Sequence, residues 1–381
     1  MPRVLAHRFR DEFDWVLFGL TFLISLAGVI NLYSTGKSSG SPDLYLTQIY
    51  WLVFGGCMAF AVAIVDYRHY EHLGYVLFGI GIALLVLVLV VGTEVNNAKR
   101  WITFGPDFGF QPSELMKVFL VVALAKLLHH DPRSEGRTLY DLVIPAAMTA
   151  VAMALILKEP DLGTALLCLL IFLSIMLLTR LKARSLFLLV ATTPLIGVLA
   201  WNYLLKPYQK ERVTSFWNSF VSPEADRLGA GWHAYQSIVA IGSGEVFGKG
   251  YLRGTAGPHH FLPEQRTDFP FSIFAEEQGF VGAFLLIAAY CALVLWSVRI
   301  AANARDRFGS VLAVGVGSIF FWHILINLGM VMGVLPVVGV TLPLFSYGGS
   351  SILTFMLCVG LLMNVSIHRY RIAGGHHGDF A

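Results

Sequence analysis

Long apolar runs separated by short polar stretches dominate the hydrophobic pattern of the chain. A helix needs about 20 apolar residues to cross a bilayer, and ten runs approach that length. They cover residues 15–34, 47–65, 73–92, 113–128, 142–157, 162–179, 185–205, 271–298, 308–335 and 343–367. Because lipid offers the backbone no hydrogen-bond partner, runs of this length predict helices. The expected fold class is an all-α polytopic membrane protein, with ten transmembrane helices in one domain that covers residues 1–381.

The charged residues that flank the runs predict how the helices are oriented. Lys and Arg gather at the N-terminus, in the even-numbered connections and after the last run, whereas the first, third, fifth and ninth connections carry few. Short loops that are rich in Lys and Arg stay in the cytoplasm. We therefore expect both termini inside and the odd-numbered connections outside. The first run is too long for the apolar part of a cleavable signal peptide, so it is expected to remain as a membrane helix.

The seventh connection, residues 206–269, is much longer than the others and is expected to be an extracytoplasmic loop. Long connections in compact domains are commonly functional. Residues 232–241 within it combine aromatic and apolar side chains with few charges, which predicts a helix lying at the membrane interface. The last residues, 372–381, are expected to form a flexible tail.

The composition excludes several classes of protein. Of the 381 residues, 56% are hydrophobic and only 13% are charged, against about 25% charged residues in a soluble domain. An ordinary cytosolic globular protein is therefore excluded, and a net charge of +3 gives no indication of a nucleic-acid partner. The four cysteines lie inside apolar runs without a Cys-x-x-Cys pair, so they are interpreted as packing residues.

Polar residues that membrane helices do not need for folding gather in the odd-numbered connections. They lie at positions 99–101 and 111–114 in the third connection, 159–161 in the fifth, 263–269 in the seventh and 346–351 at the start of the last run. The predicted orientation places all four groups on one leaflet. The sequence therefore predicts a polar site that is open to the extracytoplasmic side.

Several of these residues have a functional and a structural interpretation. Lys117 follows Glu114 by three residues, so the two share a helix face. Ionisable groups inside membrane spans are usually functional, but Lys117 could simply pair with Glu114 or extend to the interface. Glu159 and Asp161 either serve the site or cap the next helix. Asp268 lies between the basic Arg266 and an apolar helix start, without an acidic neighbour in the sequence, and is a further candidate for function.

Two patterns in the last two runs are weaker. His323, beside Asn327 in the middle of its run, is interpreted as a hydrogen-bonded packing histidine. Ser346 and Ser350 are four residues apart, so a helix through both would present them on one face.

A glycine-rich stretch at residues 242–250 is similar to a phosphate-binding loop. It is not a Walker A motif, because Gly250 stands where Ser or Thr must hold magnesium. Lys249 in this stretch remains a candidate for contact with a lipid-linked pyrophosphate outside the membrane.

Seven short motifs, in order along nearly the whole chain, resemble the SEDS family (shape, elongation, division and sporulation). They lie at residues 99–102, 111–114, 160–164, 236–244, 248–250, 267–269 and 346–350. The Pro-Glu-Gln-Arg sequence at 263–266, Lys158 before the Pro-Asp pair and the short termini favour the elongation branch of the family over the division branch.

The resemblance implies a peptidoglycan glycosyltransferase of the bacterial inner membrane. Such an enzyme polymerises lipid II, the undecaprenyl-pyrophosphate-linked disaccharide pentapeptide, into glycan strands on the outer face. The implied partner is a class B penicillin-binding protein, which cross-links the strands. Asp268 matches the essential aspartate of the family. The family commonly has an apolar residue where this chain has Pro270, and proline suits a first helical turn, so Asp268 is expected just before the eighth helix.

The implied reaction inverts the donor sugar and therefore needs a base on the acceptor hydroxyl. Asp268 is assigned as that base. Cations must offset the charge of the leaving pyrophosphate, and a divalent ion, Mg²⁺ or Mn²⁺, is a second means of doing so, with Asp268 as its ligand in an alternative role; no organic cofactor is expected. The residues expected to bind substrate are Arg100, Glu114, Lys117, Glu159, Asp161, Arg212, Gln236, Lys249, Ser346 and Ser350.

Two other classes of function remain open at this point. A lipid II flippase needs a polar path across the whole bilayer, whereas the polar groups here favour one leaflet. A scaffold that only recruits the cell-wall machinery explains partner binding but gives no reason for Asp268 or Lys117.

Overall fold

The computed structural model describes residues 13–38, 43–95, 98–103, 109–131, 136–178, 181–221, 231–255 and 265–369. Each of the ten apolar runs forms a helix. These helices are α2 (Trp15–Ser38), α3 (Leu44–Ile64), α4 (Tyr67–Val91), α5 (Pro112–His129), α6 (Val143–Lys158), α7 (Leu162–Leu178), α8 (Ala183–Leu199), α12 (Pro270–Ala302), α13 (Arg307–Val331) and α14 (Gly349–His368). A 3₁₀ turn, η1 (Tyr140–Leu142), precedes α6, and a π-helical segment, η2 (Ala200–Leu204), follows α8.

Seven of the described helices are long and apolar enough to cross a membrane. They are α2, α3, α4, α6 with its preceding turn, α12, α13 and α14. The helix α7 is apolar but shorter, α8 has 17 residues, and α5 carries the charged residues Glu114, Lys117 and Lys126. The predicted helical, multi-pass membrane fold is confirmed, whereas the count of ten spans is not.

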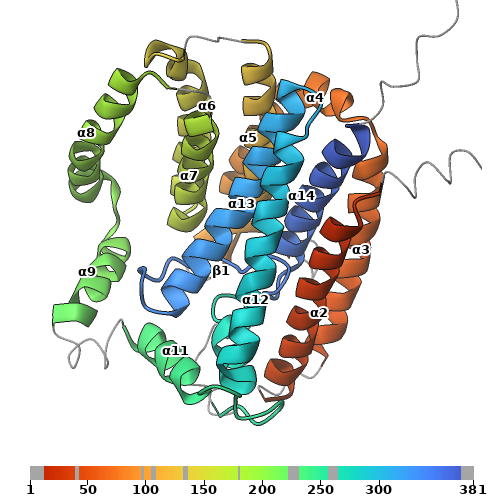
Figure 1. The fold of residues 1–381 in the computed structure, drawn as a ribbon. Coiled ribbons are helices and arrows are strands. Elements are labelled where there is room, and N and C mark those ends of the chain that lie inside the picture. Colours follow the sequence, from red (N-terminus) through yellow and green to blue (C-terminus); the bar gives the residue numbers. More distant parts are fainter. Residues whose placement is uncertain are drawn as a thin grey trace, which may run out of the picture.

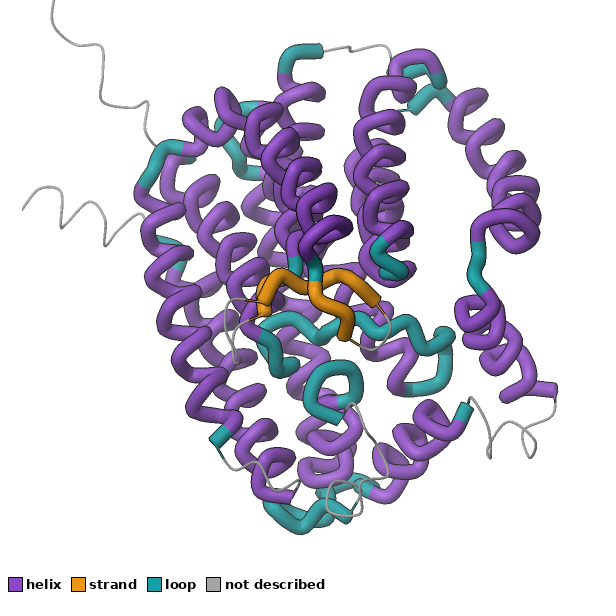
Figure 2. Tube along the Cα trace, turned by 180° about the vertical axis from the view of Figure 1, so that it is seen from behind, coloured by secondary structure: helices purple, strands orange, loops and turns teal. Residues whose placement is uncertain are grey.

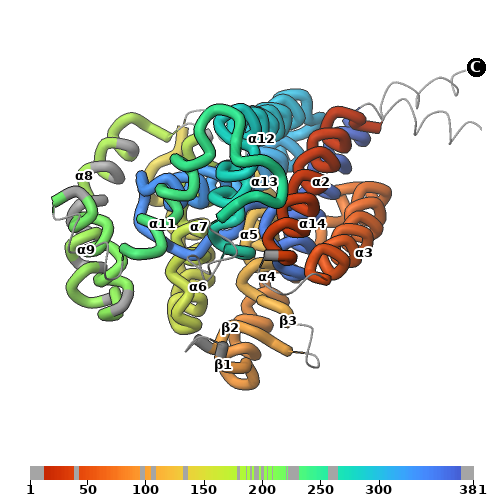
Figure 3. The backbone as a smooth tube through the Cα atoms, turned by 90° about the horizontal axis from the view of Figure 1, so that it is seen from below, coloured from red at the N-terminus to blue at the C-terminus, as the bar shows by residue number. Residues whose placement is uncertain are grey.

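The helices α13 and α14 form the centre of the bundle (Figure 1). Within their apolar windows, 72% of the residues of α13 and 89% of those of α14 are buried, against 22% for α3 and α4. The helices α8 and α9 (Pro207–Val221) lie apart from this centre when the molecule is seen from below (Figure 3). A site held by α13 and α14 is therefore held by the two most buried of the seven membrane-length helices.

The third connection contains a small sheet that the sequence did not predict. Its strands are β1 (Thr93–Val95), β2 (Ala98–Thr103) and β3 (Gly109–Phe110), which pair in the order β1-β2-β3 and are antiparallel. In Figure 2 the strands lie about halfway down the view, directly below the end of the front helix. Because β3 ends directly before α5, the sheet sets where the polar start of α5 enters the bundle.

The long seventh connection is largely helical in its described parts. The predicted helix at 232–241 is confirmed as α11 (Trp232–Ser243), whereas α9 was not predicted. Ser237 on α11 bonds to Ser272 Oγ (2.8 Å) and donates to the carbonyl of Val331 (2.6 Å), which fixes α11 against α12 and α13. The predicted tail at 372–381 lies outside the described residues.

The helix α12 is broken at Gly279, whose φ of 65° and ψ of −167° are not helical. The preceding glycine-rich loop lies across the break, and we call residues 244–255 the strap. Strap backbone N–H groups of Lys249 and Gly250 donate to the carbonyls of Glu276 and Glu277 (both 3.0 Å). After the break, the Phe280 N–H donates to the carbonyl of Glu245 in the strap (2.9 Å). The strap thus supplies hydrogen bonds that a continuous helix would have made within itself.

Hydrogen bonds between helices define the two ends of the bundle. At one end, Asp14 before α2 accepts from the indole of Trp296 near the end of α12 (2.9 Å) and from Ser366 near the end of α14 (2.8 Å). At the other end, Asn31 of α2 donates to the carbonyl of Pro270, where α12 begins (3.0 Å). The polar connections described below all belong to this second end.

Candidate functional site

The four polar connections meet at one end of the bundle, as predicted. Gln111 of the third connection donates to the carboxylate of Asp161 in the fifth (2.9 Å). Asn327 of α13 donates to the carbonyl of Asp268 in the seventh (2.9 Å) and to that of Val340 in the ninth (2.6 Å). The side of the bundle that carries these groups is therefore a single polar region.

Asp268 lies two residues before Pro270, the first residue of α12, so the predicted helix start is confirmed. Its carboxylate approaches the connection between α13 and α14, where a Cβ added at Gly339 would lie 3.2 Å from Asp268 Oδ2. Gly339 has a φ of 80°, a conformation that favours glycine. The Asp268 carboxylate thus packs against the backbone of the α13–α14 connection at Gly339.

Arg212 on α9 reaches the same connection. Its guanidinium Nη1 donates to the carbonyl of Val338 (3.1 Å), the residue before Gly339. A cation from the long seventh connection and the Asp268 carboxylate therefore contact adjacent residues of one segment. Arg212 is exposed, so its guanidinium is also accessible from outside the protein.

Asp161 is a helix cap and a link between connections. Its carboxylate accepts from the backbone N–H of Thr164 (3.0 Å) and from the Thr164 hydroxyl (2.9 Å) at the start of α7. Close by, a Cβ at Gly163 would lie 3.1 Å from the Val338 side chain, so this helix start packs on the connection that carries Gly339. Asp161 therefore fixes the start of α7 beside the position of Asp268.

Glu159 is a buried carboxylate that makes no described side-chain hydrogen bond. Its side chain is fully buried, and neither carboxylate oxygen has a hydrogen-bond partner within the described parts of the chain. Burial, and to a smaller extent the charge of Asp161, raise the pKa of Glu159 to about 8, although the charge of Arg100 on β2 acts in the opposite direction. Arg100 is half-buried and its Nε also lacks a described partner. Arg100 thus acts on Glu159 as a nearby charge rather than as a hydrogen-bonded partner.

Lys117 on α5 forms the centre of a buried polar chain. Its ammonium donates to Glu114 Oε1 (2.9 Å) and lies 2.7 Å from His323 Nε2 on α13. The other ring nitrogen of His323 lies 3.1 Å from the carbonyl of Thr341, two residues after Gly339. Sequence reasoning interpreted His323 as a hydrogen-bonded packing histidine, and the structure shows it buried and hydrogen-bonded between Lys117 and the α13–α14 connection.

The expectation for Ser346 and Ser350 is corrected by the structure. The helix α14 begins at Gly349 rather than at residue 343, so the two serines do not share a helix face. The Ser346 hydroxyl accepts from the N–H of Leu342 (2.8 Å) within the connection. The Ser350 hydroxyl donates to the carbonyl of Gly109 on β3 (3.0 Å) and accepts from the N–H of Gln111 (3.1 Å). Each serine therefore holds backbone segments together.

The described hydrogen bonds of Lys249 lie within the strap and α12. Lys249 donates to Glu276 Oε1 (2.6 Å) and to the hydroxyl of Thr255 (2.9 Å), which joins the strap to the broken helix. Gln236 is half-buried on α11. The glycines around Lys249 serve this crossing, since a Cβ at Gly248 would lie 2.1 Å from the carbonyl oxygen of Glu277.

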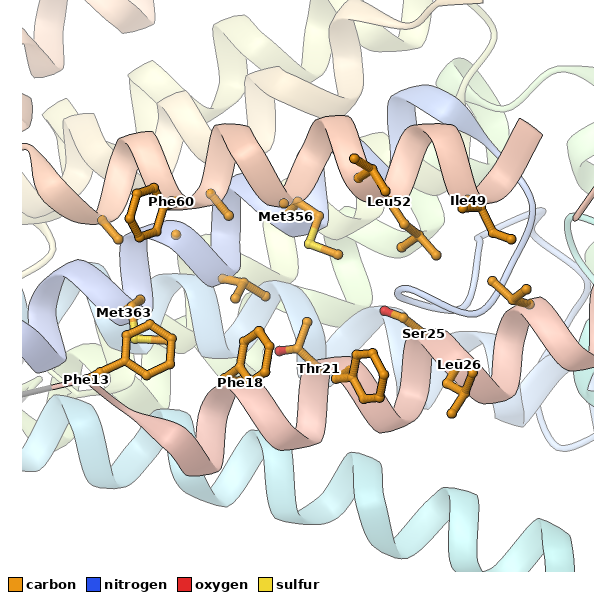
Figure 4. A pocket seen from close by; sticks show the side chains of 18 residues that line it. Phe13, Phe18, Thr21, Ser25, Leu26, Ile49, Leu52, Phe60, Met356 and Met363 are labelled. Carbon is orange, nitrogen blue, oxygen red and sulfur yellow. The ribbon is translucent and has the colours of Figure 1, made fainter. Parts of the chain in front are cut away.

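An apolar groove of about 440 Å³ lies between α2, α3 and α14 (Figure 4). Phe18, Phe60 and Met356 are among its lining residues, and Thr21 and Ser25 are its polar members. None of the predicted site residues lines it. The groove is therefore separate from the polar region around Asp268.

No group of three or more His, Cys, Asp or Glu side chains suited to a metal ion occurs among the residues that the structure describes. Mg²⁺ typically needs only one or two protein carboxylates when substrate phosphates supply its other ligands. A metal ion bound through Asp268 would therefore need further ligands from a substrate.

The sequence model of the FtsW/RodA/SpoVE family, described as "Cell cycle protein", matches residues 12–371. The chain belongs to this family. The FtsW/RodA/SpoVE match covers every described residue of the polar region, so the family resemblance seen in the short motifs is confirmed.

Individual members of the FtsW/RodA/SpoVE family are similar over almost their full length. Peptidoglycan glycosyltransferase RodA of Treponema pallidum is 33% identical, over 93% of this chain and 98% of the relative. Peptidoglycan glycosyltransferase MrdB of Escherichia coli is 37% identical, over 93% of both chains. A chain from the solved structure "Structural coordination of polymerization and crosslinking by a peptidoglycan synthase complex" is 35% identical with a TM-score of 0.79, over 94% of this chain and 99% of that one.

Sequence reasoning assigned no linking role to the residues that connect the predicted ones, although Gln111 and Thr164 lie in the motifs that it identified. Asn327, Gln111 and Thr164 hold Asp268 and Asp161 in place through the hydrogen bonds given above. Asn327 and His323 are polar residues four apart inside an apolar run, and this spacing places them on one helix face. That pattern was the available signal for their role.

Proposed function

We propose that the chain polymerises lipid II into glycan strands during cell elongation. Relatives named peptidoglycan glycosyltransferase align with 93% of the chain, and this enzyme class applies to it. The observation that carries the substrate and the site is the approach of Asp268 and Arg212 to adjacent residues of the α13–α14 connection. A carboxylate and an accessible cation are the two groups that this reaction requires side by side.

The Asp268 carboxylate acts as the base in this proposal. The acceptor 4-hydroxyl oxygen attacks the anomeric carbon of the donor, and Asp268 takes the hydroxyl proton. The bond to pyrophosphate breaks with its electron pair on the leaving oxygen, so an α-linked donor gives a β-linked strand. Undecaprenyl pyrophosphate is already a good leaving group, and the enzyme therefore needs no general acid.

Arg212 is the cation best placed for the leaving pyrophosphate. It is exposed and contacts the connection beside the Asp268 carboxylate. Guanidinium binds phosphate through two parallel hydrogen bonds. Lys117 is fully buried and already bonded to Glu114 and His323, so its contribution is a fixed positive charge beneath the site rather than direct contact.

A divalent cation, Mg²⁺ or Mn²⁺, fits this arrangement as part of the substrate complex. Its ligands would be pyrophosphate oxygens together with the Asp268 carboxylate, and it would supply charge neutralisation to the leaving group. In that version, Asp268 is a metal ligand rather than the base.

The proposal places the polar region on the extracytoplasmic face of the inner membrane, where Lys and Arg are scarce in the connections. Both termini are then cytoplasmic. The similar solved chain comes from a peptidoglycan synthase complex in which polymerisation and cross-linking are coordinated. We extend that arrangement to this chain, with a class B penicillin-binding protein as the partner that cross-links the strands.

The test is polymerisation of fluorescent lipid II by the purified full chain, with and without its class B partner. Glycan gels would compare wild type with Asp268→Asn at matched concentrations of Mg²⁺, Mn²⁺ or EDTA. We expect strands from wild type and a rate lowered by about 10²–10⁴-fold in Asp268→Asn, the usual cost of removing a general base. Size-exclusion and thermal unfolding of the variant are the folding controls.

Either of two outcomes would overturn the proposal. Full activity in a folded Asp268→Asn variant would remove Asp268 from the chemistry. Absence of polymer from wild type with partner and metal present, together with movement of lipid II across liposomes, would favour a transporter.

A further inference from the structure

Asn327 lies in the last part of α13 and is completely buried. Both acceptors of its Nδ2 group, the carbonyls of Asp268 (2.9 Å) and Val340 (2.6 Å), belong to segments outside α13. Because both partners are carbonyl oxygens, the nitrogen of the amide must face them. One side chain therefore joins the segment before α12 to the connection before α14.

These two carbonyls lie on either side of the contact between Gly339 and the Asp268 carboxylate. Val340 follows Gly339, on which the carboxylate rests. Holding the backbone of Asp268 and that of Val340 to one amide fixes both sides of this contact. The amide donates to the backbone carbonyl of Asp268, so its effect on the reaction passes through the position of that residue.

The preceding turn of α13 strengthens the same arrangement. His323, four residues before Asn327, lies 3.1 Å through Nδ1 from the carbonyl of Thr341. Consecutive carbonyls of the connection, at Val340 and Thr341, are thus held by one face of α13. The connection that contacts the Asp268 carboxylate is therefore hydrogen-bonded to the buried helix α13.

We propose that Asn327 is a positioning residue for Asp268, which sets the aim of its carboxylate by binding the backbone on both sides of the Asp268–Gly339 contact. This inference rests on the proposed function. Misplacement of a reacting group by about 1 Å costs on the order of 10²-fold in rate. Loss of the anchor is therefore expected to lower kcat while substrate binding, which depends on other groups, is retained.

The chain contains a matched control in Asn364 of α14. Asn364 is also fully buried, and its Nδ2 also donates to two backbone carbonyls, those of Val62 (2.6 Å) and Val65. In both asparagines Oδ1 lacks a described partner. Asn364 holds the turn between α3 and α4, at the end of the bundle opposite to Asp268. The two asparagines therefore make the same bonds in different places.

The experiment measures kcat and KM for fluorescent lipid II and the thermal midpoint for Asn327→Ala, Asn327→Ser and Asn364→Ala, in the full chain with its partner. We expect similar losses of Tm in the two alanine variants, because each loses the same pair of hydrogen bonds. Only Asn327→Ala is expected to lose kcat, by about 10- to 100-fold, with KM changed less than about threefold. Asn327→Ser retains one donor and is expected to lie between wild type and Asn327→Ala.

Equal losses of activity per folded molecule in Asn327→Ala and Asn364→Ala would overturn the inference. So would a rise of KM at unchanged kcat in Asn327→Ala. If Asn327→Ala does not fold, a folded Asn327→Ser variant with wild-type kcat overturns it equally. Failure of the proposed function is seen separately, as an inactive wild type or a fully active Asp268→Asn.

Discussion

The ammonium of Lys117 lies 2.7 Å from Nε2 of His323, and this distance fixes the tautomer of the imidazole. An ammonium can only donate, so Nε2 accepts and the ring proton lies on Nδ1. That proton is donated to the carbonyl of Thr341 at 3.1 Å. The neutral ring of His323 therefore links the buried Lys117 ammonium to the connection that carries Gly339.

The Lys117 charge makes the stability of the protein depend on Glu114. Glu114→Gln leaves a fully buried ammonium without a counter-charge, and breaking one side of a buried pair costs about 3–5 kcal/mol. We expect a large drop in Tm in detergent, and recovery of much of it in the double variant Glu114→Gln/Lys117→Met. Glu94→Gln is the control, because its 3.9 Å pair with Lys99 is exposed. An equal effect of the two single variants would contradict this expectation.

Gly339→Ala tests the contact with Asp268 directly. The change forces a residue with φ of 80° to carry a Cβ and places that Cβ 3.2 Å from Asp268 Oδ2. We expect kcat to fall by about 10-fold or more, measured as the rate of strand formation. Gly333→Ala is the control, because Gly333 has a φ of 73° in the same connection but contacts Ile238 instead. The prediction fails if both variants lose kcat alike.

Glu159 predicts a pH dependence of stability with an unusual sign. Its pKa of about 8 in the folded state lies above the ordinary value of 4.5. Between these values the folded state holds a proton that the unfolded state has lost. The free energy of unfolding therefore falls as the pH rises through this window, by at most about 1.4 kcal/mol per pH unit, and the fall ends above pH 8.

The measurement for Glu159 is the Tm of wild type and Glu159→Gln from pH 4.5 to pH 9. We expect the advantage of Glu159→Gln over wild type to grow as the pH rises from about 5 to about 8 and then to level off. The exposed carboxylate variant Glu94→Gln serves as the control. A difference between wild type and Glu159→Gln that stays constant over the whole range would show that the carboxylate does not titrate there.

Lys249→Met separates a structural role of this lysine from a role in substrate binding. The Glu276 side chain is 1% exposed and lies 2.6 Å from the Lys249 ammonium, so removal of the lysine leaves a buried carboxylate without its cation. We expect a lower Tm, an unchanged KM for lipid II, and partial recovery of Tm in Lys249→Met/Glu276→Gln. A raised KM at unchanged Tm would instead identify Lys249 as a substrate cation.

The sequence predicted the apolar helices and which connections meet, because apolar length and charge asymmetry are properties of single segments. It did not predict where α14 begins. Residues 343–348 are apolar enough to extend the run, but Leu344 and Gly348 have positive φ, and the Ser346 hydroxyl holds a turn instead. Local hydrophobicity contains no information on that choice, which tertiary hydrogen bonds determine.

The sequence predicted which residues belong to the site but not how they contact one another. Asp268, Arg212 and Asp161 were selected from residue type, position and the family resemblance, and the structure brings all three to the start of α7 and the α13–α14 connection. The linking role of Asn327 depends on pairing across 59 residues. A pattern along one segment cannot reveal such a pairing, because both acceptors are backbone carbonyls, which every residue has.

The break in α12 has a consequence for the way in which this helix enters the bilayer. The part that follows Gly279 extends to Ala302 and reaches roughly 34 Å at 1.5 Å per residue, enough to cross a hydrocarbon core of about 30 Å by itself. Glu276 and Glu277 therefore stay out of the segment that the translocon has to recognise. The short segment that carries them is completed by hydrogen bonds from the strap, which precedes α12 in the chain.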